Sequence, residues 1–168
     1  MGHSVKTVLH AGCGSCCLPP YLAGHKEVRL DIDPSVKPDI YATITNLGDI
    51  GPYDIIYTSH TLEHIYQHEV EKAVSEFHRV LKDGGVAIVS VPDLTDVKCD
   101  DEPLYDSPAG MITGRDMYFG KHDMVKDNHY MGHKTGFTRD TLRSAMGIFK
   151  EVKLISENPY NIMAIGVK

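Results

Sequence analysis

Residues 5–15, VKTVLHAGCGS, begin the fold of this chain as a short apolar strand that runs into a turn with two glycines. Glycine lets the backbone of such a turn approach a ligand closely. Asp31 follows Gly14 by seventeen residues and ends the next apolar stretch. In an open α/β sheet this combination is typical of a nucleotide site, where the acidic residue binds ribose hydroxyls. Any tight turn after a strand favours glycine, so the rest of the chain must support this interpretation.

Strands and helices alternate along the sequence that follows. Apolar stretches predict strands at residues 28–31, 40–44, 53–58 and 86–91, and helical spacing predicts one long helix over 62–81. Thr138 is expected to cap a last helix, and residues 152–155 and 162–167 to pair as a hairpin. We therefore expect an α/β fold with a doubly wound, seven-stranded, mostly parallel sheet and a C-terminal antiparallel hairpin.

The stretch from Asp93 to Gly136 breaks this alternation and is rich in Asp, Gly, His, Met and Tyr. An irregular insert of this length in a compact domain usually serves as a lid or a substrate loop. We expect residues 1–168 to form a single domain, with this insert at about 93–136 built into it. Ligands of such sheets bind at the carboxyl ends of the strands, where the insert begins.

Composition excludes several classes of protein. The net charge of −6 makes a nucleic-acid partner unattractive. No apolar run approaches the roughly 18–20 residues of a membrane span, and no signal-peptide core is present, so we expect a soluble, cytoplasmic protein without a membrane partner. Cys13, Cys16 and Cys17 have the spacing of redox or metal motifs, but they are interpreted as small fillers of a tight turn. Nothing in the sequence indicates the oligomeric state.

Four blocks in this order resemble the class I S-adenosylmethionine-dependent methyltransferases: residues 8–15 (VLHAGCGS), 30–34 (LDIDP), 53–64 (from YDII to SHTLEH) and 78–85 (HRVLKDGG). Together the blocks span about half the chain. The resemblance implies a Rossmann-like methyltransferase fold with S-adenosylmethionine as cofactor and S-adenosylhomocysteine as product. Residues 13–19, 31–37 and 133–138 are similar to small type 11-like methyltransferases associated with glycan and cell-surface polysaccharide genes.

The resemblance also implies the cofactor contacts. The turn Gly12-Cys13-Gly14 would face the methionine part, and Asp31 would bind the ribose, with Ile32 against the adenine. Thr43 and Ile44 would lie by the adenine ring, and Ser59 and His60 by the sulfonium. His10 occupies a cofactor-side position where the broader family commonly has an acidic residue.

Methyl transfer to a hydroxyl is an in-line displacement, so the protein positions the reactants and removes a proton. Histidine suits the role of base because its pKa lies near neutrality. The candidates near the strand edge and on the insert are Asp93, His122, His129, His133 and His60. We favour His133 as the base, with Asp93 as the second candidate. The predicted reaction is O-methylation of a small molecule or a sugar-containing, glycan-type metabolite.

Three alternatives remain open. The altered glycine turn and the short chain are compatible with a non-catalytic module that binds S-adenosylmethionine or serves assembly. His60-x-x-Glu63-His64 spells the inverted zinc-peptidase motif, in which two histidines four residues apart on a helix ligate zinc. The insert pairs His122-Asp123 and Asp127-Asn128-His129 could offer ligands to a divalent ion, but their spacing in an irregular loop defines no geometry. No metal is therefore predicted.

Overall fold

A computed structural model describes residues 4–168 and shows a seven-stranded sheet in the order β3-β2-β1-β4-β5-β9-β8. Strands β3 through β5 are parallel, and β9 pairs antiparallel with both β5 and β8. The predicted fold class, with its C-terminal hairpin, is confirmed. The strands are β1 (Thr7–Ala11), β2 (Lys26–Asp31), β3 (Ile40–Tyr41), β4 (Tyr53–Ser59), β5 (Leu81–Pro92), β8 (Glu151–Glu157) and β9 (Asn161–Val167).

The strand order places a topological switch point between β1 and β4. From β1 the chain builds outward through β2 and β3, and then it returns to add β4 on the other side of β1. The connections after β1 and β4 therefore pass to opposite faces of the sheet from its carboxyl edge, which is where ligands of open α/β sheets bind. Val8, Leu9 and Ala11 of β1 are buried, as expected for a central strand.

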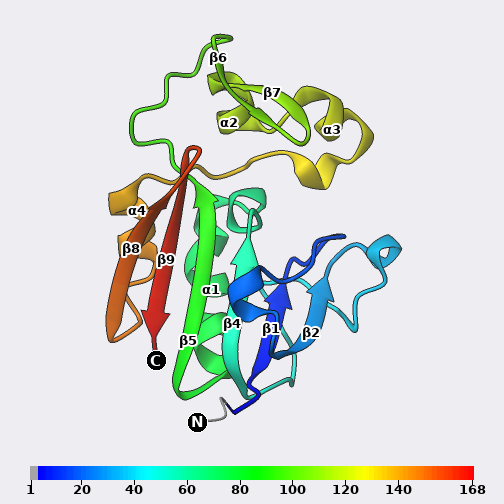
Figure 1. Cartoon of the computed structure of the whole chain (residues 1–168), viewed down its shortest axis with the longest axis vertical. Coiled ribbons are helices and arrows are strands. Elements are labelled where there is room, and N and C mark those ends of the chain that lie inside the picture. Colours follow the sequence, from blue (N-terminus) through cyan, green and yellow to red (C-terminus); the bar gives the residue numbers. More distant parts are fainter. Residues whose placement is uncertain (1–3) are drawn as a thin grey trace.

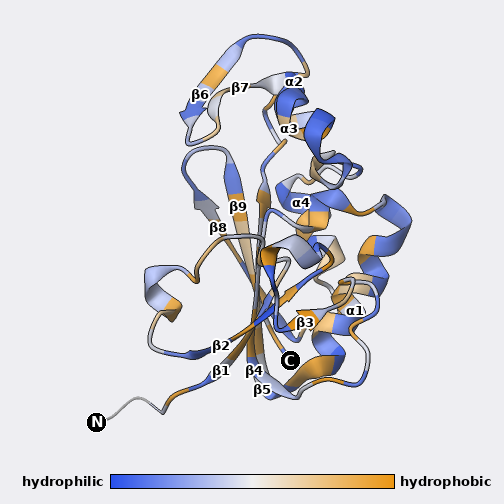
Figure 2. Cartoon of the chain, turned by 90° about the vertical axis from the view of Figure 1, so that its right-hand side faces the viewer, coloured by the Kyte–Doolittle hydropathy of each residue, from blue (hydrophilic) through white to orange (hydrophobic). Residues whose placement is uncertain are grey.

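The two faces of the sheet are covered differently (Figures 1 and 2). Helices α1 (Val70–Val80) and α4 (Arg139–Ala145) pack on one face and share the larger apolar core with it. The other face carries a smaller apolar cluster, which is closed by the segment around the short 3-10 turn η1 (Pro20–Leu22). Pro19 caps this turn and Pro20 begins it, a position where proline is favoured because the N–H that it lacks would have no partner within the turn.

The helix predicted over 62–81 is shorter than expected, and this part of the prediction is wrong. Two 3-10 turns, η3 (Leu62–His64) and η4 (Gln67–Glu69), precede α1, which begins only at Val70. Ile65 and Tyr66 are extended and separate the two turns, and the Glu69 carboxylate accepts the Tyr66 backbone N–H. The apolar spacing continues through this break because each segment still points a side chain at the core.

The strand predicted at 40–44 is likewise shorter, since β3 is limited to Ile40–Tyr41. Thr43 and Thr45 hydroxyls lie 3.0 Å apart, and the Asn46 N–H donates to the Thr43 carbonyl at 3.0 Å. These local hydrogen bonds form a turn, which short polar side chains favour over a sheet ladder.

The sequence predicted an irregular insert, but the structure shows that parts of it are regular. It holds a hairpin of β6 (Pro103–Ser107) and β7 (Gly110–Thr113). The helices α2 (Gly114–Phe119) and α3 (His122–Asp127) and the 3-10 turn η5 (His129–Met131) follow. Leu94, Val97 and Met117 form a small apolar cluster of its own. The insert lies beyond the carboxyl ends of β1, β4 and β5 (Figure 1). No helix within residues 4–168 is long and apolar enough to cross a membrane.

Candidate functional site

The glycine turn after β1 is held by backbone contacts to the end of β2. Gly12 and Cys13 donate their N–H groups to the Leu30 carbonyl at 2.8 and 3.1 Å. Gly12 has a φ of +67°, and a Cβ at this position would collide with the Thr61 side chain in the loop after β4. Glycine is therefore required here both for its conformation and for the close approach of two loops.

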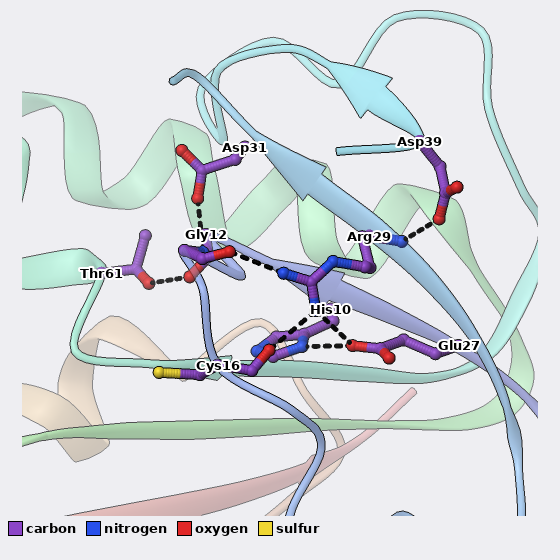
Figure 3. A network of polar contacts seen from close by, with 9 residues as sticks. His10, Gly12, Cys16, Glu27, Arg29, Asp31, Asp39 and Thr61 are labelled. Atoms are coloured by element: carbon purple, nitrogen blue, oxygen red, sulfur yellow. Dashed lines mark hydrogen bonds and ion pairs between the residues drawn. The ribbon is translucent and has the colours of Figure 1, made fainter. Parts of the chain in front are cut away.

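Asp31 organises the turn from the tip of β2. One oxygen of its carboxylate accepts the Gly14 N–H at 2.7 Å (Figure 3). The other oxygen accepts the Asp33 N–H at 2.9 Å. A carboxylate offers about four acceptor positions, so ribose hydroxyls can still bind beside these two donors. Ile32 follows; it is 39% exposed and lines the cavity described below, and its contact with adenine stays a prediction.

A network of polar side chains in β1 and β2, which the sequence analysis missed, holds the glycine turn in place. Arg29 donates to the carbonyls of Gly14 at 2.6 Å and Cys16 at 2.7 Å (Figure 3). His10 Nδ1 lies 2.7 Å from the Glu27 carboxylate, which also lies 3.4 Å from Arg29. Alternate positions of a strand share a face, so the charged Glu27 and Arg29 in β2, beside the polar His10 in β1, were the signal for this network.

Burial lowers the pKa of His10, although the hydrogen bond with Glu27 opposes the shift. His10 is therefore neutral near pH 7, and its ring lines the site while its Nδ1 is hydrogen-bonded to Glu27. Burial also raises the pKa of the Cys13 thiol, which keeps it protonated. Cys13 is buried in the turn, as a small filler should be, whereas Cys16 and Cys17 are exposed, so the filler interpretation fits Cys13 alone.

One cavity of about 630 Å³ opens at the switch point. All of the sequence-predicted cofactor residues line it: His10, Gly12, Cys13, Gly14, Asp31, Ile32, Thr43, Ile44, Ser59 and His60. Its far side is formed by Met124, Asn128, Tyr130 and Met131 of the insert, which the sequence analysis did not single out. This volume falls within the roughly 300–1,000 Å³ of small-molecule sites. The structure thus places the predicted residues together and encloses them with the insert.

A cluster of histidines around a buried glutamate borders this cavity. His60, with a φ of +52°, places its Nδ1 3.2 Å from the Glu63 carboxylate. His64 Nδ1 contacts the Gly132 carbonyl at 3.2 Å, and His133 Nδ1 contacts the Met117 carbonyl at 2.8 Å. His60 and His64 line the cavity, whereas His133 lines an adjacent shallow hollow and meets the His64 ring edge-on. We refer to His60, Glu63, His64 and His133 as the histidine cluster.

The charges of the histidine cluster depend on one another. Burial would raise the pKa of Glu63, but its hydrogen bond with His60 and the three nearby histidines lower it. Burial would lower the pKa of His60, and the Glu63 partner more than offsets this and raises it. Burial lowers the pKa of His133. The arrangement thus combines an ionised, buried carboxylate with a neutral imidazole at His133.

The other candidates do not join this site. Asp93 accepts hydrogen bonds from the Thr95 backbone and hydroxyl and does not line the cavity, so it caps the turn after β5. His122 and His129 are exposed on the insert. The peptidase motif is not formed as a helical pair, because His60 stands at the end of β4 and His64 ends the 3-10 turn η3.

Comparison with known proteins finds similarity to methyltransferases. A model of the methyltransferase domain matches residues 9–89, the segment that carries the glycine turn, Asp31 and the loop after β4. No curated protein sequence matches the chain.

The solved structures that resemble the chain include a 1,6-didemethyltoxoflavin-N1-methyltransferase from Burkholderia thailandensis, with bound 1,6-didemethyltoxoflavin and S-adenosylhomocysteine. The match has 16% identity and a TM-score of 0.61 and covers 98% of this chain and 71% of that one. A methyltransferase from Archaeoglobus fulgidus matches with 15% identity and a TM-score of 0.66 over 98% of this chain and 86% of that one. The methyltransferase SibL, in its apo form, matches with 15% identity and a TM-score of 0.67 over 98% of this chain and 50% of that one. At these identities the likeness concerns the fold.

Proposed function

We propose that this chain, a class I S-adenosylmethionine-dependent methyltransferase, methylates an oxygen atom of a small molecule or sugar-containing metabolite. The observation that carries the proposal is the continuous cavity that runs from the glycine turn to Tyr130 and Met131 of the insert. An acceptor in this cavity is enclosed between the cofactor side and the insert, which suits a small molecule better than a polymer. No Lys or Arg is found among the described residues that line it, so a phosphate clamp is not provided there.

In this proposal the cofactor occupies the switch-point side of the cavity. Asp31 binds the ribose with the acceptor positions that Gly14 and Asp33 leave free. Ile32, Thr43 and Ile44 form the adenine side, and the methionine part lies against the turn from Gly12 to Gly14. The methyl group then faces Ser59 and His60, on the side where the insert closes the cavity.

The acceptor chemistry is assigned to the histidine cluster, in which His60 and His64 line the cavity and the favoured base His133 lies beside His64. A hydroxyl oxygen attacks the methyl carbon in line, the carbon–sulfur bond breaks, and its electron pair remains on sulfur in S-adenosylhomocysteine. The hydroxyl proton must leave at the same time, and a neutral imidazole with an unshared Nε2 lone pair can receive it. Asp93 takes no part, because its carboxylate is engaged in the turn after β5.

Calorimetric titration with S-adenosylmethionine and S-adenosylhomocysteine tests the cofactor site. We expect micromolar binding that Asp31→Ala abolishes and that Glu71→Ala, an equal change of charge on the exposed side of α1, leaves unchanged. Absence of binding to the wild-type protein would contradict the proposal.

A second assay follows transfer of a labelled methyl group to pools of hydroxylated metabolites, nucleotide sugars and glycans, with nitrogen heterocycles as a comparison pool. Label in the hydroxylated pools supports the proposal. Label in the nitrogen pool alone would reject oxygen as the acceptor atom. Cofactor binding without any transfer would favour the non-catalytic module.

A further inference from the structure

Three side chains of the histidine cluster are arranged as a set of metal ligands. One ligand atom from each of Glu63, His64 and His133 lies within 4.8 Å of the other two, and this is the only such group among residues 4–168. Ligand atoms around an ion bonded at about 2.1 Å lie at most about 4.2 Å apart. Small rotations of these side chains would therefore close the three atoms around one ion.

The hydrogen bonds of the two imidazoles leave the Nε2 atom of each ring free to bind a metal ion. His64 Nδ1 faces the Gly132 carbonyl, and His133 Nδ1 faces the Met117 carbonyl. A carbonyl only accepts hydrogen bonds, so each Nδ1 carries the proton and each Nε2 keeps its lone pair. Metal-bound histidines usually donate their second ring N–H to a backbone carbonyl or carboxylate in this way.

Glu63 provides an independent indication of a ligand. The residue is 1% exposed, and its Oε2 has no hydrogen-bond partner within the described chain, while its Oε1 contacts His60. Leaving a buried charged oxygen unpaired is costly, so such groups are normally paired or bound to metal. A cation between Oε2 and the two Nε2 atoms would satisfy it.

The backbone holds the ligands in place although they are far apart in the sequence. The N–H groups of Lys134 and Thr135 donate to the Glu63 carbonyl at 2.7 and 3.1 Å. The Thr135 hydroxyl donates to the Ile65 carbonyl at 2.7 Å, and Lys134 Nζ donates to the His64 carbonyl at 2.9 Å. The end of the insert is thus clamped to the segment after β4, which preorganises a site in the way that metal binding requires.

From this geometry we propose that Glu63, His64 and His133 bind one divalent first-row transition-metal ion, such as Zn²⁺ or Mn²⁺, beside the acceptor end of the cavity, where His64 lines it. Two imidazoles and one carboxylate favour such an ion over Mg²⁺, which prefers oxygen ligands. Three protein ligands leave coordination positions open for an exogenous oxygen. His60 then supports the site by holding the second oxygen of Glu63.

The catalytic part of this inference rests on the proposed function. An acceptor hydroxyl would bind an open position of the ion, which lowers the pKa of the hydroxyl. Its proton passes to solvent, and the oxygen forms the new bond to the methyl carbon as the carbon–sulfur bond breaks towards sulfur. His133 would then serve as a ligand instead of a base.

Metal binding is measured first on tag-free, chelator-treated protein without cofactor or acceptor. Titration with Zn²⁺, Mn²⁺ and Mg²⁺ should show that each chain binds one transition-metal ion and that it binds Mg²⁺ with lower affinity. Co²⁺ in place of the ion should give visible absorption bands. Glu63→Gln and His133→Asn should each weaken binding by more than the roughly 10–100-fold that changes around a metal site cost. His68→Ala, an exposed histidine four residues after His64, should bind like the wild type.

A wild-type chain that binds no ion, or whose binding survives both ligand substitutions, would overturn the site. Thermal melting and S-adenosylmethionine titration of the same variants identify a misfolded protein, and the Co²⁺ spectrum of the wild type remains decisive if a variant fails to fold. Metal binding without methylation of any hydroxyl acceptor would reject the proposed function and leave the site standing. Full methyl transfer to a hydroxyl in chelator-treated protein would reject the catalytic role of the ion.

Discussion

The two ends of the cavity are built by different means. The cofactor end is made mostly of backbone groups from short contiguous motifs, such as the Gly12–Gly14 turn and its contacts with Leu30 and Asp31. Beside the acceptor end, the histidine cluster brings together side chains from two segments about seventy residues apart, Glu63 and His64 on one side and His133 on the other, and of these three only His64 lines the cavity. Backbone sites depend on conformation and close approach, whereas side-chain sites depend on long-range clamps. Substitutions at the two ends should therefore affect stability and ligand affinity in different ways.

The largest effect is expected for Gly12→Ala, at the cofactor end. The new Cβ would meet the Thr61 side chain in a left-handed conformation. The strain and the overpacking together should cost roughly 3 kcal/mol of stability and abolish S-adenosylmethionine binding. Gly14→Ala is the matched control, because Gly14 is also left-handed but has open space around it. Chemical denaturation measures both, and equal losses would show that conformation alone matters and that the approach of the two loops does not.

An intermediate effect is expected for Glu76→Gln, which acts on the loop that carries Thr43 and Ile44. The Glu76 carboxylate accepts the Leu47 N–H at 2.8 Å and pairs with Arg79 at 2.7 Å. Loss of the charge should lower the free energy of unfolding by about 1.5 kcal/mol at pH 7, because one charge-assisted bond and one partly screened pair are weakened.

The same substitution has a defined pH dependence. Arg79, through its hydrogen bond, is the main cause that holds the pKa of Glu76 below its ordinary value of 4.5. The contribution of a carboxylate with a lowered pKa is complete above the unfolded pKa and is lost as the pH falls through the folded pKa. The difference in stability between wild type and variant should therefore be constant near neutrality and shrink below about pH 4.5. A difference that stays constant at pH 3 would contradict this account.

The smallest effect on stability is expected for Thr135→Val, at the acceptor end. The substitution removes the hydroxyl that donates to Ile65 and keeps the shape of the buried side chain. It should cost about 1 kcal/mol or less in thermal or chemical unfolding. Metal affinity should fall because the clamp between the two segments is loosened, whereas S-adenosylmethionine affinity should be unchanged. A parallel loss of both affinities would show that the two ends of the cavity are not independent.

Sequence patterns predicted local features well where one short segment carries the signal. The strand–turn stretch at residues 5–15 and Asp31 were correctly expected to meet at one edge of the sheet, and the C-terminal hairpin was also expected. Periodicity failed at 62–69, because apolar spacing does not distinguish a helix from 3-10 turns whose side chains reach the same core. Within the insert, elements as short as α2 (Gly114–Phe119) are too brief to show a period.

The sequence by itself determined the succession of the strands of the main sheet along the chain, the glycine turn and the acidic tip of β2, because these follow from local conformation and from the alternation of apolar residues. Only the tertiary structure decided that Arg29 supports the turn, that Asp93 caps a loop, and that His133 meets Glu63 and His64. The physical reason is that these contacts join side chains across long loops. Their geometry is set by packing and by backbone clamps that no single segment encodes.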